Sequence, residues 1–112
     1  YELSKSDKKI ARALIDKGAD IEFKITLEQA DKIIAEWKSG VSDNRTAYHK
    51  LLKNVDERNN RIANRYDGLT GSGYLPTVAS IYVDGQITED DIKGISEETR
   101  AVLNKWLELS KR

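Results

Sequence analysis

The chain has 112 residues, of which 38% are hydrophobic and 34% charged, so it is hydrophilic but has enough apolar residues for one core. Its 19 basic and 19 acidic residues give a net charge of zero. The absence of Cys excludes disulfides, cysteine nucleophiles and thiolate metal sites, and a single His argues against zinc. No apolar run approaches the ~20 residues of a membrane-spanning helix.

The first third of the chain is predicted to form helix, strand and helix. Residues 6–17 have apolar positions at helical spacing, and Gly18 stands where a helix commonly ends. The next segment, IEFKI at 21–25, alternates apolar and charged residues as a half-buried strand does. Thr26 and Gln29 then match a capping box, which predicts a second helix as far as Trp37 or Lys38.

Residues 44–66 contain neither Pro nor Gly and predict one long helix. Its apolar positions follow each other at steps of four and three, the rhythm of a heptad, with one Asn among them. This pattern predicts either an interaction seam or the face of a helix that packs on the chain's own core. The seam consists of Tyr48, Leu52, Val55, Asn59 and Ile62.

A glycine-rich stretch, YDGLTGSGYLP, follows the long helix and predicts a flexible connection over residues 67–76. It lacks the Lys of a phosphate-binding P-loop, and its glycines do not match the dinucleotide pattern either. Residues 80–88 place Asp-Gly between two β-rich arms and favour a β-hairpin, with a helix that ends at Gly85 as the alternative. Ser96 followed by two Glu opens a last helix.

Together these elements predict a single domain over residues 1–112, mainly α or α+β with a small β-hairpin. Four to five helices are expected around the long central helix.

The charge is unevenly distributed, although the total is neutral. Residues 45–65 hold six basic against two acidic residues, a local charge of +4, whereas residues 84–98 hold six acidic residues against one Lys, a local charge of −5. Arg and Asn side chains combine phosphate contacts with hydrogen bonds to base edges, so the basic segment is a candidate nucleic-acid surface. The candidate residues are Arg45, Lys50, Asn54, Arg58, Arg61 and Arg65.

The order of the predicted elements resembles that of the winged helix-turn-helix superfamily over roughly residues 6 to 88. The segment Gly40-Val41-Ser42, followed by Thr46 and Leu51, is similar to the turn and second-helix opening of that superfamily. The resemblance implies DNA binding through the start of the long helix. The residues that would then face the major groove are Asn44, Arg45, Tyr48 and His49.

The sequence therefore favours a non-catalytic nucleic-acid-binding or regulatory module that acts through its basic long helix. The alternative is a protein-interaction or self-assembly module built on the seam of the same helix. We expect no catalytic residues, no metal and no cofactor, and partners among DNA, RNA, another protein or a second copy. We also expect no membrane partner and a cytoplasmic location, which leaves room for a targeting segment removed from the N-terminus.

Overall fold

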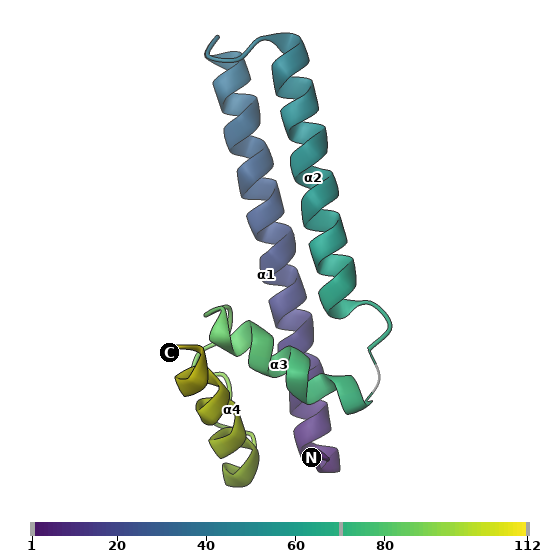
Figure 1. Cartoon of the computed structure of the whole chain (residues 1–112), viewed down its shortest axis with the longest axis vertical. Coiled ribbons are helices and arrows are strands. Elements are labelled where there is room, and N and C mark those ends of the chain that lie inside the picture. Colours follow the sequence, from purple (N-terminus) through teal and green to yellow (C-terminus); the bar gives the residue numbers. More distant parts are fainter. Residues whose placement is uncertain (1, 70, 112) are drawn as a thin grey trace. The chain divides into compact units, whose positions relative to one another are not determined.

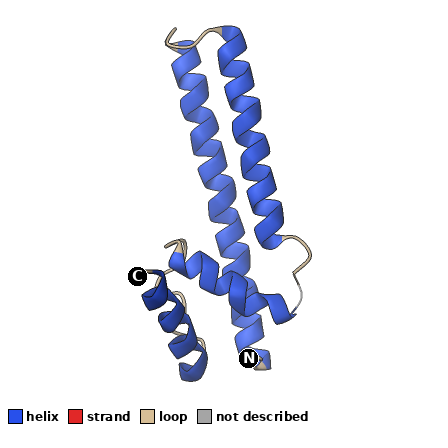
Figure 2. Cartoon of the chain, in the orientation of Figure 1, coloured by secondary structure: helices blue, strands red, loops and turns tan. Residues whose placement is uncertain are grey.

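The protein is mainly helical. A computed structural model describes residues 2–69 and 71–111, and no strand occurs among them (Figures 1 and 2). The described residues form four α-helices and one short 3-10 helix, which confirms the mainly α prediction and the number of helices. These elements are α1 (Lys5–Lys38), α2 (Asn44–Tyr66), the 3-10 helix (Gly71–Gly73), α3 (Tyr74–Val83) and α4 (Glu97–Ser110).

Helix α1 replaces three predicted elements and corrects the sequence interpretation. The helix over 6–17, the strand over 21–25 and the helix that begins at Thr26 are one continuous helix of 34 residues. Gly18 is buried inside it, and the Thr26 hydroxyl donates a hydrogen bond to the Glu22 carbonyl, 2.9 Å away, instead of capping a new helix. An interior Gly costs a helix only about 1 kcal/mol relative to Ala, which tertiary contacts can offset.

Helix α2 has the bounds predicted from the sequence. The Asp43 side chain accepts a hydrogen bond from the Thr46 N–H at 2.7 Å and caps the N-terminus of α2. At the end of α1, Gly40 has a φ of +84°, and the N–H groups of Gly40 and Val41 bond to the carbonyls of Trp37 and Glu36. This pattern is a Schellman motif, which reverses the chain between α1 and α2.

The predicted β-hairpin over 80–88 is wrong, because α3 continues through Val83. Gly85 has a φ of +78° and ends this helix in a second Schellman motif, as the alternative interpretation had it. Asp-Gly therefore terminates a helix here instead of joining two strands. The glycine-rich connection is also shorter than the predicted 67–76, since α3 begins at Tyr74. Thr70, within this connection, lies outside the described residues.

The chain divides into two compact units, and α1 contributes to both. The terminal unit comprises residues 1–19 and 68–112, and the hairpin unit comprises residues 20–67. In the terminal unit α3 and α4 pack on each other. Its buried apolar residues include Ala11, Leu14, Val78, Ile81, Ile87, Ile92 and Leu103.

The hairpin unit consists of the second half of α1 and the antiparallel helix α2, which lie side by side (Figure 1). Among the described residues, no helix has the length and apolar character needed to cross a membrane.

Candidate interaction surface

The side of α2 that faces α1 consists mainly of residues one position before the predicted seam, and it also includes the seam residue Ile62. Along this inner line Ala47 and Ile62 are buried, and the Asn54 side-chain nitrogen is buried without a hydrogen-bond partner among the described residues. The line advances by steps of four, three, four, four and three, so it follows a heptad rhythm as far as Arg58 and departs from it at Ile62. Its members are Ala47, Leu51, Asn54, Arg58, Ile62 and Arg65.

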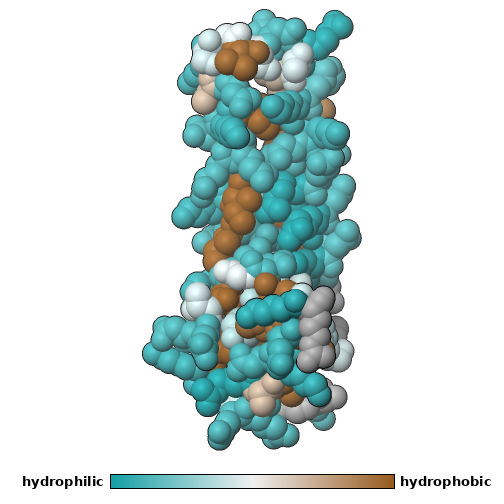
Figure 3. Space-filling view, turned by 60° about the vertical axis from the view of Figure 1, so that its left-hand side comes forward, coloured by the Kyte–Doolittle hydropathy of each residue, from teal (hydrophilic) through white to brown (hydrophobic). Residues whose placement is uncertain are grey.

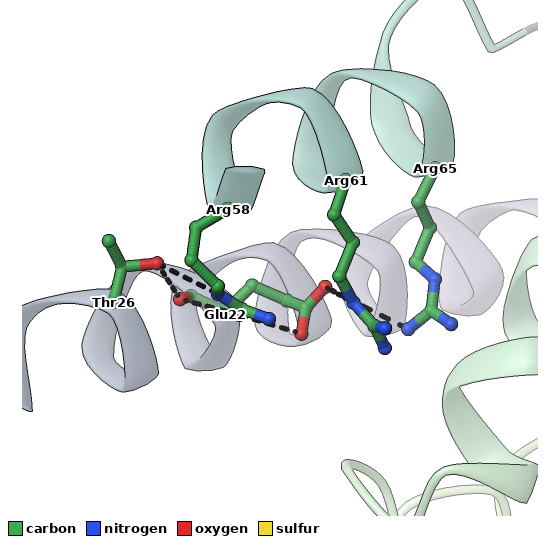
Figure 4. A network of polar contacts seen from close by, with 5 residues as sticks. All are labelled: Glu22, Thr26, Arg58, Arg61 and Arg65. Atoms are coloured by element: carbon green, nitrogen blue, oxygen red, sulfur yellow. Dashed lines mark hydrogen bonds and ion pairs between the residues drawn. The ribbon is translucent and has the colours of Figure 1, made fainter. Parts of the chain in front are cut away.

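A buried carboxylate on α1 gathers three arginines of α2 (Figure 4). Glu22 is 1% exposed, and its Oε1 accepts a hydrogen bond from Arg58 Nη2 at 3.2 Å. Its Oε2 lies 3.6 Å from Arg61 Nε and 3.8 Å from Arg65 Nη1. The buried charge is therefore compensated across the interface between the two helices, as buried ions require.

Arg58 is the most deeply engaged of the three arginines. Besides the carboxylate, it donates hydrogen bonds to the Glu22 carbonyl and to the Thr26 hydroxyl, each at 3.2 Å. The Arg58 and Arg65 side chains are only 14% and 16% exposed, whereas that of Arg61 is 49% exposed. Two of the basic residues predicted from the sequence, Arg58 and Arg65, are thus mostly covered within the hairpin unit, whereas Arg61 stays half exposed.

The remaining candidates for nucleic-acid contact lie apart from this cluster. Arg45 is exposed in the first turn of α2, and Lys50 forms an ion pair with Glu36 of α1 at 3.3 Å. Glu22 was missed in the sequence analysis, because it lies within the segment interpreted as a strand. The available signal was the spacing of Glu22 and Thr26, which share one face if the segment is helical.

Several large apolar side chains of the hairpin unit are exposed. Each one directly follows, in the sequence, a residue that faces the neighbouring helix. On α1 they follow Glu22, Ile33 and Glu36; on α2 they follow Ala47, Leu51 and Asn54. Leu27 is 70% exposed, Tyr48 63% and Leu52 55%. We call this set the apolar face: Phe23, Leu27, Ile34, Trp37, Tyr48, Leu52 and Val55.

Both rows of the apolar face lie on the same side of the hairpin unit. A step of one residue turns a helix by about 100°, and in antiparallel neighbours equal steps from the inner line turn toward the same side. A cavity of about 240 Å³ agrees with this geometry, because Ile34 and Trp37 of α1 line it together with Tyr48 of α2. In Figure 3, apolar side chains form strips along the hairpin among hydrophilic ones.

The side of α2 away from the apolar face is polar. The residues that precede the inner line by one position are polar or charged throughout, and Lys53 forms an exposed pair with Glu57 at 3.9 Å. An unpartnered solvent-facing helix surface normally looks like this side and not like the apolar face. These residues are Thr46, Lys50, Lys53, Glu57, Arg61 and Asn64. Asn60, three residues after Glu57 and four before Asn64, lies on the same side of the helix.

Among the predicted seam residues, Tyr48, Leu52 and Val55 belong to the apolar face, whereas Ile62 is buried. Asn59 is exposed and continues the same row one turn beyond Val55.

The terminal unit has a polar cluster of its own. Asp7 is 3% exposed and accepts hydrogen bonds from the Ser96 N–H, the Ser96 hydroxyl and the Thr99 hydroxyl, at 2.9, 2.6 and 2.8 Å. Burial raises the pKa of Asp7, but the hydrogen bonds from Ser96 and Thr99 outweigh it, so the pKa lies below its usual value. The carboxylate thereby connects α1 to the N-terminus of α4, where negative charge is favourable.

A basic patch also lies in the terminal unit, around a depression of about 330 Å³. Arg12 donates to the Tyr74 hydroxyl at 2.9 Å, and its guanidinium lies 5.7 Å from the centre of that ring. The patch consists of Lys5, Lys8, Lys9, Arg12 and Tyr74.

Residues 2–69 and 71–111 contain no group of three or more His, Cys, Asp or Glu side chains that could hold a metal ion. Comparisons with protein-family models, with curated proteins and with solved structures found no match. The winged helix-turn-helix resemblance stays a prediction from the sequence, although the strand and the β-hairpin on which it drew are helix and turn here.

Proposed function

We propose that the chain is a non-catalytic protein-interaction module that binds its partner through the apolar face of the hairpin unit. One observation carries this proposal: seven large apolar side chains, each exposed to solvent, form two parallel rows on a single side of two packed helices. Exposed patches of this extent usually mark interaction sites in soluble proteins.

The chemistry of the apolar face suits a protein partner. Trp37 and Tyr48 flank the cavity, and aromatic side chains are the residues most enriched among interface hot spots. The Trp37 indole N–H donates to the Asn44 side chain at 2.7 Å, which holds the ring in place before binding. The rows match the i, i+3, i+4 and i+7 spacing by which helices bind in apolar grooves.

Site-specific photocrosslinking in the source cells tests this proposal. A photoreactive benzoylphenylalanine replaces Leu52 in one variant and Asn60, on the polar side of α2, in the matched control. We expect a discrete adduct from Leu52, none from Asn60, and loss of the adduct when Leu27→Glu is added. Equal crosslinking from both positions, or none from either, contradicts the proposal.

Nucleic-acid binding is the second candidate function, and the basic patch of the terminal unit favours it. Lys5, Lys8 and Lys9 lie together beside Arg12, and Lys and Arg clusters of this kind contact phosphates. Fluorescence anisotropy with duplex and single-stranded DNA tests this candidate. Binding must weaken steeply as salt is raised, and Lys8→Glu with Lys9→Glu must abolish it; salt-insensitive binding or no binding at tens of micromolar contradicts it.

A further inference from the structure

We infer that the partner of the apolar face is a second copy of this chain, and that two hairpin units meet face to face in a four-helix bundle. This inference rests on the proposed function and adds the identity of the partner. Each copy contributes two antiparallel helices with apolar rows at heptad steps, which is the pattern that helices of a bundle bury. A two-fold contact places the same surface of both copies together, so a self-complementary apolar face suffices on each side.

The area of the apolar face is sufficient for a dimer. Large apolar and aromatic side chains expose about 150–250 Å² each when free, so the observed exposed fractions, 38–70%, leave roughly 700 Å² uncovered on this face. A stable dimer buries about 800 Å² per partner. The apolar rows alone therefore supply nearly the whole contact that association of two copies needs.

The edges of the apolar face do not oppose the approach of an identical surface. The exposed charged residues that follow the face by one position are Lys24, Glu28, Lys38, Lys53 and Asp56, so both signs of charge alternate there. A row of like charges along the edge of an interface would repel an identical surface. The charged residues named here do not form such a row.

Asn59 has a specific place in this arrangement. It is exposed in the hairpin unit, but it lies in the same row as Leu52 and Val55 and would be covered at the end of the contact between copies. A single Asn in such a position lowers the stability of helix association and fixes its register. The variant Asn59→Leu should therefore strengthen the association.

Analytical ultracentrifugation of the full chain from 1 µM to 1 mM tests the inference. Wild type should pass from 12.7 kDa to twice that mass as its concentration rises. Leu27→Glu with Leu52→Glu should weaken dimerisation at least 100-fold, whereas Asn60→Glu, which adds the same charge per site on the polar side, should change it less than threefold. Asn59→Leu should tighten it. Circular dichroism checks that the variants stay folded, since all these residues are exposed.

The chain has no Cys, so single-Cys variants report the contacting face directly. A short bismaleimide should link Leu52→Cys into covalent dimers and leave Asn60→Cys monomeric. A wild type that stays at single-chain mass up to 1 mM overturns the inference, as does a dimer that Asn60→Glu weakens as much as the double variant. If photocrosslinking from Leu52 at the same time yields an adduct with a different protein, the proposed function stands and only the identity of the partner is wrong.

Discussion

Glu22 shows how one residue determines the role of several others. Three arginines that the sequence presents as a cationic stripe face a single carboxylate on the neighbouring helix. Two of them are mostly covered, so most of their charge acts inside the protein. The nucleic-acid prediction named side chains by their spacing on α2, and spacing alone does not tell which side of a helix faces solvent.

Glu22→Gln should destabilise the protein strongly. The substitution keeps the shape of the side chain but removes the negative charge, so the buried arginines lose this carboxylate and repel one another. Breaking a buried ion pair in this way costs about 3 kcal/mol of unfolding free energy. Urea denaturation followed by circular dichroism measures the effect.

The matched control is Glu57→Gln, since Glu57 forms an exposed ion pair with Lys53 at 3.9 Å. Its loss should cost at most about 0.5 kcal/mol. If both substitutions have the same small effect, the cluster around Glu22 contributes nothing to the stability of the hairpin unit.

At the level of elements, the sequence predicted the helices over 44–66 and near the C-terminus well, and failed where tertiary contacts override local signals. The alternation of IEFKI fits a strand, yet Ile21 and Ile25 also lie one helical turn apart, as do Glu22 and Thr26. The Thr26 hydroxyl satisfies the Glu22 carbonyl within α1 instead of capping a new helix. The local sequence pattern therefore does not distinguish a strand followed by a new helix from one continuous helix.

Most of the α2 residues that pack on α1 lie one position before the predicted seam. This difference has a physical reason. Two neighbouring rows have the same rhythm from residue 47 to residue 59, and the outward row with Tyr48, Leu52 and Val55 is more apolar than the inward one. The inward row contains Asn54 and Arg58, and the charge of Arg58 is compensated there by Glu22, 36 residues earlier in the chain. Hydrophobicity therefore identified the apolar face but not the interface within the chain.

The connection between α1 and α2 depends on one backbone conformation. Gly40 has a φ of +84°, a region that a side chain with a Cβ disfavours by about 1 kcal/mol. Gly40→Ala should therefore lower the unfolding free energy by about 1 kcal/mol, and thermal or urea denaturation measures the change.

Gly94→Ala is the control, because its φ is not positive and an added Cβ would meet Ile10 at an ordinary 3.6 Å. It should leave stability within about 0.5 kcal/mol of wild type. A larger loss at Gly94 than at Gly40 contradicts the assignment of Gly40 as the conformational constraint.

For the whole molecule, acid should act most directly on the terminal unit. The hydrogen bond from Lys17 lowers the pKa of Asp91, and hydrogen bonds from Ser96 and Thr99 outweigh burial to lower that of Asp7. A carboxyl group whose pKa is lower in the folded state stabilises the fold above its unfolded pKa of about 3.9. That stabilisation is lost as the pH falls through the folded value.

Unfolding free energies measured from pH 7 down to pH 2 should therefore decline below about pH 4 to 5. Asp7→Asn should be less stable at pH 7 and should show a shallower decline, because the group that binds a proton on unfolding is gone. An unchanged pH profile in Asp7→Asn contradicts the role assigned to this carboxylate.

The division of the chain also orders events during synthesis. The hairpin unit is complete once residue 67 has been made, so α2 can meet Glu22 while the rest of the chain is still on the ribosome. The first turns of α1, although made before α2, belong to a unit whose other members follow α2 in the sequence. Asp7 and Ser96, which are hydrogen-bonded in the folded chain, are 89 residues apart in the sequence. The terminal unit therefore depends on contacts between residues that are far apart in the sequence, and contacts of this kind slow folding.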